Sequence, residues 1–176
     1  TLHYTATMYS GGVDQFLEST NNSPSSTPNA TDTCCGANFF IDKNGIAYQL
    51  GALDERLRTN PPFDAATIGI EMEAVSQEDL SQKQIEAAAY LSAYILQKTN
   101  LGASGILGET VYGHAETRGL DDANTQQWCD ILLAAGYHED NLNHCKSSGA
   151  GRTDWPTAEA EPMRSKIYDL LTKLRP

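Results

Sequence analysis

The sequence has no uninterrupted apolar segment near the roughly 18 residues that a transmembrane helix requires, so we expect no membrane span. Basic residues are also scarce: 12 Lys and Arg stand against 23 Asp and Glu, which gives a formal net charge of -11. A phosphate-rich surface would repel such a chain, which argues against nucleic-acid binding and polybasic membrane attachment. The chain opens on Thr-Leu-His rather than on a signal peptide. The first strand would normally extend further upstream of His3, so we expect the chain to be a processed or trimmed product.

No internal repeat and no long linker divides the 176 residues. Hydrophobic residues make up 40% of the chain and charged residues 20%, which is typical of a globular protein and not of a disordered one. A chain of this length is sufficient for one core of ordinary size. We therefore expect residues 1–176 to form a single domain, and the protein to be a monomer.

Cysteine is present, but no CxxC pair occurs, so neither a zinc ribbon nor a thioredoxin-like site is supported. The four cysteines are Cys34, Cys35, Cys129 and Cys145, and they permit three sets of disulfide pairings. The adjacent pair could bridge directly only as a strained disulfide, so we favour a bridge from each of them to one of the two later cysteines. N-glycosylation sequons at Asn21 and Asn29 lie in one polar loop. Together these features favour a secreted, extracellular protein. The alternatives are a periplasmic protein or a cytoplasmic one with four buried thiols.

Segments typical of strands alternate with segments of helical periodicity. Strands are predicted over residues 1–6, 38–41, 46–50, 66–74 and 106–112. The second and third of these flank Asp42-Lys43-Asn44-Gly45, a hairpin signal in which Asn-Gly suits a positive φ. Residues 19–33 are predicted to be a surface loop.

Four helices are expected. The first is a brief stretch after Gly11-Gly12, and a third covers about 121–136. The clearest one begins at a capping box formed by Ser81 and Gln84. The last carries Pro162 near its first turn. The alternation predicts an α/β or α+β-like fold with a central sheet packed between helices.

Histidines are few, and strand ends can bring two of them together from distant parts of the chain. A catalytic zinc needs three protein ligands and one open position. Asp154, at the entry to the last helix, could supply the third ligand. Spacing alone does not choose between the two possible pairs, which are His3 with His114 and His138 with His144.

Two carboxylates share one face of the strand predicted around residue 70. Alternation places Glu71 and Glu73 on one face and Ile70 and Met72 on the other. If the strand is central and covered on both sides, an inward Glu requires a partner or a function. The alternative is a solvated face on which both are ordinary surface residues.

Five short blocks follow one another along the chain. They are His3-Tyr4-Thr5-Ala6, Phe39 to Gly45 with Tyr48-Gln49, Thr67 to Glu73, Tyr112 to Glu116, and Arg152 to Pro156. In this order they resemble one known family, the zinc-dependent N-acetylmuramoyl-L-alanine amidases of the type 2 amidase and peptidoglycan-recognition-protein superfamily. The resemblance runs from residue 1 to about 175, with interruptions at 19–35 and at about 117–150.

The resemblance implies a mixed central sheet flanked by helices, with one Zn2+ at its edge and a helical insertion at about 117–150. By the family pattern, His3, His114 and Asp154 bind zinc. Glu71 is the catalytic general acid and base, and Arg152 stabilises the oxyanion. The reaction implied is hydrolysis of the amide bond between N-acetylmuramic acid and L-alanine in bacterial peptidoglycan or muropeptides.

The sequence departs from the family pattern in two places that affect the site. Asn38 stands where many relatives carry a histidine. Forty residues separate His114 from Asp154, where relatives often have far fewer. Four other side chains within the insertion could compete for the metal: Cys129, His138, His144 and Cys145. A cysteine in a disulfide could not, because it cannot bind as thiolate.

Two functions from different classes fit these residues. The first is a secreted zinc amidase that degrades cell wall. The second is a module on the same fold that binds peptidoglycan or muropeptides without cutting them. Because such binders usually lose a zinc ligand, retention of all three ligands together with Glu71 favours catalysis.

Overall fold

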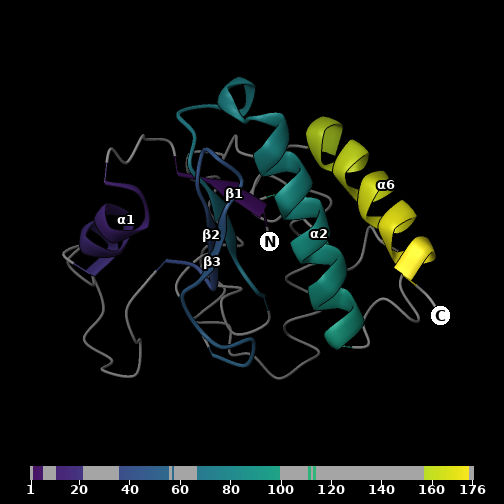
Figure 1. Cartoon of the computed structure of the whole chain (residues 1–176), viewed down its shortest axis with the longest axis horizontal. Coiled ribbons are helices and arrows are strands. Elements are labelled where there is room, and N and C mark those ends of the chain that lie inside the picture. The colour runs from purple at the N-terminus through teal and green to yellow at the C-terminus, as the bar shows by residue number, and fades with distance from the viewer. Residues whose placement is uncertain are drawn as a thin grey trace, which may run out of the picture.

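The computed structural model describes residues 2–5, 11–21, 36–55, 57, 67–99, 111, 113 and 157–174. A four-stranded mixed sheet lies between helices, with the strand order β1-β4-β2-β3 (Figure 1). The strands are β1 (Leu2–Tyr4), β2 (Phe39–Ile41), β3 (Ala47–Gln49) and β4 (Ile70–Met72). β4 is parallel to both of its neighbours, β1 and β2, whereas β2 and β3 form an antiparallel hairpin. The predicted α/β class with a mixed central sheet is confirmed.

One face of the sheet carries the main hydrophobic core. Two long helices pack on this face and on each other: α2 (Gln82–Lys98) and α6 (Thr157–Leu174) (Figure 1). The sheet contributes alternate residues to the core, among them Ile70 and Met72 of β4. The expected apolar faces of both helices are confirmed, with Ala88, Ala89, Ile95, Met163 and Ile167 buried in this core.

The opposite face of the sheet packs against α1 (Gly12–Asn21), which lies across the sheet from α2 and α6 in Figure 1. The contact is aromatic: the ring of Phe16 stacks on the ring of Phe40, with centroids 4.7 Å apart. Such pairs add to the free energy gained by burying the rings. α1 therefore extends into the region 19–33 that was predicted to be a loop, and residues 19–21 are helical. Polar composition at the end of a helix gives little signal of where the helix stops.

The β2–β3 turn forms as the Asp-Lys-Asn-Gly signal predicts. Asp42 Oδ1 accepts hydrogen bonds from the backbone N–H groups of Asn44 and Ile46, both at 2.9 Å. Gly45 has φ +81°, and a Cβ atom at this position would lie 2.8 Å from the backbone oxygen of Lys83. Glycine is required here by both the left-handed backbone and the close approach of α2.

The capping box at the start of α2 is confirmed and does more than cap the helix. Ser81 Oγ accepts from the N–H of Gln84, and Gln84 Oε1 accepts from the N–H of Ser81. Gln84 is fully buried, and its Nε2 donates to the carbonyl of Glu73 at 2.8 Å and to that of Ile41 at 3.4 Å. One amide side chain therefore joins α2 to the ends of β4 and β2.

The last helix starts at Thr157, three residues after Asp154, as expected for a residue at its entry. Pro162 lies inside α6, five residues after its start and so just past the first turn near which it was expected. Proline removes one backbone donor from the helix interior. Burial of Met163 and Ile167 compensates for that loss by packing the helix on the core. The predicted helix at 121–136 and the insertion at 117–150 lie outside the described residues, as does most of the strand expected at 106–112.

We predict that Gln84→Ala lowers the free energy of unfolding by about 2–3 kcal/mol, because two buried carbonyls and the N–H of Ser81 lose their partner. Urea denaturation measures this change. Gln82→Ala is the matched control, since Gln82 is exposed and its amide bonds to Glu86 on the helix surface. Its effect should stay within about 0.5 kcal/mol. Equal losses in the two variants would contradict the joining role of Gln84.

Candidate active site

The residues with catalytic potential form a row across the sheet. In the parallel register His3 of β1 pairs with Glu71 of β4, and Glu71 pairs with Phe40 of β2. Paired residues of adjacent strands project from the same face of a sheet. Phe40 contacts α1, so the imidazole and the carboxylate share the face that α1 partly covers. The sheet thus brings together residues 68 positions apart in the chain.

His3 lies on β1, an edge strand of the four-stranded sheet. Its side chain is buried, and the residue is 1% exposed. β4 borders β1 on one side, and on the other side Leu2 forms a parallel bridge with Gly113. His114 lies outside the described residues, but it follows Gly113 directly in the chain.

Glu71 occupies the centre of the sheet. It is partly buried, whereas its strand neighbours Ile70 and Met72 are buried in the core on the opposite face. The predicted alternation is therefore confirmed, and β4 is an interior strand. The alternative of an ordinary solvated sheet face does not fit Glu71, because its row neighbours His3 and Phe40 are 1% and 0% exposed.

Glu73 has a structural environment different from that of Glu71. It follows the end of β4 and is 5% exposed, so the alternative of a solvated face does not apply to this residue. Its Oε2 accepts a hydrogen bond from the backbone N–H of Lys43 in the hairpin turn, at 3.2 Å. The carboxylate thereby holds the turn against the end of β4.

Asn38 is a buried structural residue at the start of β2. Its Nδ2 donates to the carbonyls of Ala52 and Glu55 at 3.0 and 3.1 Å, and its Oδ1 accepts from the N–H of Gly69 at 2.9 Å. All of these partners are backbone groups. The Asn38 amide thus fastens the chain that enters β4.

Tyr48 continues the row beyond Phe40, since the two residues pair in the hairpin. Its hydroxyl donates to Asp42 Oδ2 at 3.5 Å. Partial burial raises the pKa of Tyr48, and the Asp42 carboxylate raises it further by repelling the phenolate. The hydroxyl therefore stays protonated at neutral pH and is suited to donate a hydrogen bond, not to act as a base.

The other predicted site residues lie outside the described residues; they are His114, Arg152, Asp154, Cys34, Cys35, Cys129 and Cys145. Within the described part, no group of three or more His, Cys, Asp or Glu side chains could hold a metal ion. That part includes one of the three predicted ligands, His3. Nor does any described helix combine the length and the apolar character of a membrane span.

The model of one protein family, described as N-acetylmuramoyl-L-alanine amidase, matches residues 1–130. The chain belongs to this family. The match includes the whole sheet, α1 and α2, and therefore the row that contains His3 and Glu71. No curated protein and no solved structure matches the chain significantly. Membership supports an amidase-type function on peptidoglycan in general terms.

The side chains of this amidase are chemically suited to zinc. Neutral imidazole and carboxylate oxygen are both common zinc ligands. Two imidazoles and one carboxylate leave the fourth coordination position of zinc open. Of these side chains, the described residues include the imidazole of His3 on β1, which pairs with Glu71 on β4. Arg152 and Asp154 lie beyond the residues that the family model matches, so their roles stay predictions.

One buried basic residue was missed by the sequence interpretation. Arg164 lies on α6 between Met163 and Ile167, and all three are nearly inaccessible to solvent. A charged residue inside the apolar stripe of a helix was the available signal, because such a residue needs partners when buried. Its guanidinium donates to the carbonyl of Val111, which precedes His114 by three residues.

We predict that Asn38→Asp destabilises the fold by at least about 3 kcal/mol at neutral pH. The substitution removes two donors and turns a buried negative charge towards two carbonyl oxygens. Urea denaturation provides the measurement, and Asn44→Asp is the control because Asn44 is exposed in the hairpin turn. A loss no larger than that of Asn44→Asp would show that the Asn38 amide does not fasten the sheet.

Proposed function

We propose that the protein is a zinc-dependent amidase that hydrolyses the bond between N-acetylmuramic acid and L-alanine in peptidoglycan or its fragments. The observation that carries the proposal is the pairing of His3 with Glu71 across β1 and β4, in a chain of the amidase family. A metal ligand and a proton acceptor on adjacent strands are the two elements that metal-assisted amide hydrolysis requires.

We propose His3, His114 and Asp154 as the zinc ligands. The Leu2–Gly113 bridge supports the first two, because the Cα atoms of consecutive residues are about 3.8 Å apart. Continuation of the parallel register by one residue would bring His114 next to His3. Asp154 precedes the start of α6 by three residues, and α6 packs on the same sheet.

The mechanism assigns one role to each remaining residue. Bound zinc would polarise the scissile carbonyl and lower the pKa of the attacking water to about 7. Glu71 takes the proton from this water through a carboxylate oxygen and then passes it to the nitrogen of the leaving L-alanine. Arg152, permanently charged, stabilises the oxyanion of the tetrahedral intermediate; one such donor is typically worth about 3 kcal/mol of barrier.

We also propose that the enzyme acts as a secreted monomer whose cysteines pair as disulfides. The support for secretion and disulfides comes from the sequence, which has an even number of cysteines and N-glycosylation sequons at Asn21 and Asn29. The net charge of -11 gives no attraction to anionic wall polymers. Recognition of the wall would then depend on specific contacts with the muropeptide.

We predict one zinc per chain in the wild type, and its loss in His3→Ala and Asp154→Ala. Elemental analysis of the purified variants measures it. Asp169→Ala is the matched control, because Asp169 is an exposed carboxylate of α6, and it should retain the metal. Zinc retained by Asp154→Ala would move the third ligand into residues 117–150.

We predict that Glu71→Gln lowers kcat by at least about 100-fold while zinc remains bound, because the amide cannot accept the proton of the attacking water. Release of the L-alanine-headed peptide from a muramyl peptide measures the rate. Glu73→Gln is the control on the same segment; its amide oxygen can still accept from Lys43, so activity should be retained. Muropeptide binding with neither zinc nor cleavage in the wild type would support the recognition module instead.

A further inference from the structure

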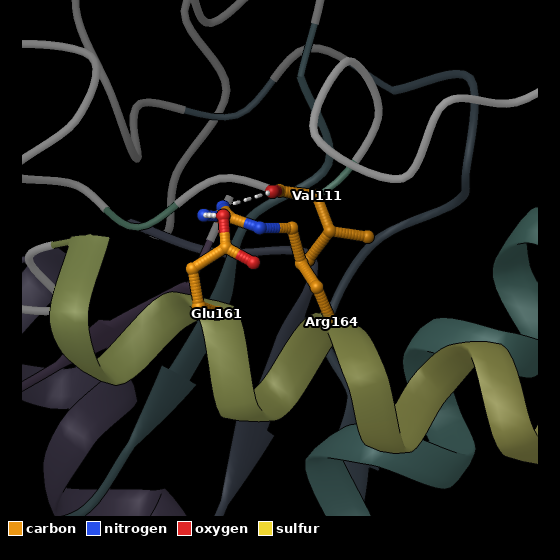
Figure 2. Close-up of polar contacts among 3 residues, drawn as sticks. All are labelled: Val111, Glu161 and Arg164. Carbon is orange, nitrogen blue, oxygen red and sulfur yellow. Dashed lines mark hydrogen bonds and ion pairs between the residues drawn. The ribbon is translucent and has the colours of Figure 1, made fainter.

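Arg164 forms a buried polar link between α6 and the chain segment at Val111. Its side chain is 6% exposed. Nη1 donates to the backbone oxygen of Val111 at 3.1 Å, and Nη2 contacts Glu161 Oε1 at 2.7 Å. Figure 2 shows the guanidinium reaching from α6 to the Val111 carbonyl, with the Glu161 carboxylate beside it from the preceding turn of the helix.

An arginine is an unusual residue at a buried core position. Burial of a guanidinium carries a large desolvation penalty, and a well-packed apolar side chain in such a place is often equally stable. The counterion, Glu161, is 62% exposed and so remains largely in water. Stability alone is therefore a weak reason for an arginine here, whereas a fixed geometry between α6 and Val111 is a property that an apolar residue would not provide.

Arg164 joins α6 to the segment at Val111, and each of these is near a different ligand of the proposed metal site in the sequence. Val111 precedes His114 by three residues, and Gly113 between them is bridged to Leu2, next to His3. On the other side, α6 begins three residues after Asp154. Three residues of chain span at most about 11 Å, which ties His114 closely to Val111 and Asp154 closely to the start of α6. Arg164 lies seven residues further along α6, about 10 Å along the helix axis.

We propose that Arg164 is a positioning residue for the zinc site. By holding the Val111 carbonyl to α6, it sets the distance between the segment that provides His114 and the segment that provides Asp154. Glu161 keeps the guanidinium in the orientation that this hydrogen bond needs. This inference rests on the proposed zinc amidase function. Arg164 acts through the ligands and does not itself contact substrate.

The experiment compares zinc affinity among variants of the full chain, by competition with a chromophoric chelator. Arg164→Met removes the donors and keeps an unbranched apolar side chain, and Arg164→Lys restores the charge and one donor group. Lys166→Met is the matched control: it removes one positive charge from the same helix, at a residue whose side chain is 32% exposed and lies 3.9 Å from Glu86. Visible absorption of the cobalt-substituted proteins reports ligand geometry in each variant.

We expect Arg164→Met to bind zinc about 10-fold more weakly than the wild type, as is typical when support of a ligand is lost. Its cobalt spectrum should shift, Arg164→Lys should recover part of the affinity, and Lys166→Met should match the wild type. A purely structural role would lower the melting temperature of the metal-free protein without changing the cobalt spectrum. Wild-type affinity and spectrum in folded Arg164→Met would overturn the proposal.

A second pair of variants covers the case in which Arg164→Met does not fold. Glu161→Ala and Glu86→Ala each remove an exposed carboxylate from an ion pair, at Arg164 and at Lys166 respectively. Weaker zinc binding in Glu161→Ala than in Glu86→Ala supports the positioning role, and equal affinities overturn it. If the wild type binds no zinc, the proposed function itself fails; if it binds zinc and no Arg164 or Glu161 variant differs, only this inference fails.

Discussion

The parallel pairing of β4 with both β1 and β2 is the constraint on which the rest of the structure depends. It sets two rows across the sheet: Leu2, Ile70 and Phe39 on one face, and His3, Glu71 and Phe40 on the other. A shift of one residue would exchange the faces and expose the first row. The first row is buried in the core under α2 and α6, so the free energy of apolar burial opposes any such shift. The register that aligns His3 with Glu71 is thus enforced from the opposite side of the sheet, by apolar core residues.

Buried amides fasten β4 at both ends, which makes the position of Glu71 more rigid than three residues of strand would allow alone. Before the strand, Asn38 Oδ1 accepts from Gly69; after it, Gln84 Nε2 donates to the carbonyl of Glu73. Both amides also bind backbone groups of other segments, so the ends of β4 are linked to β2 and to α2. A side chain is held in one place only when its surroundings fix it. For Glu71 that support comes from the buried amides of Asn38 and Gln84, which bind backbone groups at the two ends of β4.

The sequence predicted those features that depend on neighbouring residues. The Ser81–Gln84 capping box, the turn around Gly45 and the alternation at Glu71 each follow from local rules, and all three are confirmed. The strand order could not be derived, because no local sequence pattern indicates that His3 lies beside Glu71. Asn38 and Arg164 were missed as structural residues for the same reason: their partners are 14–31 and 53 positions away. Pro162 was expected near the first turn of the last helix; it lies just past that turn, where burial of the following residues supports proline inside the helix.

The last helix, α6, lies beyond the residues that the family model matches. The matched residues end at 130, yet α6 covers the same core as α2, with Met163 and Ile167 buried against residues of the sheet. A chain that ended with the matched region would lose this cover and would expose part of the face that enforces the register. It would also lose Arg164, whose hydrogen bond to Val111 is a direct link between the C-terminal part and the strand-like segment beside β1. The geometry of the site on one face therefore depends on a helix that packs on the other.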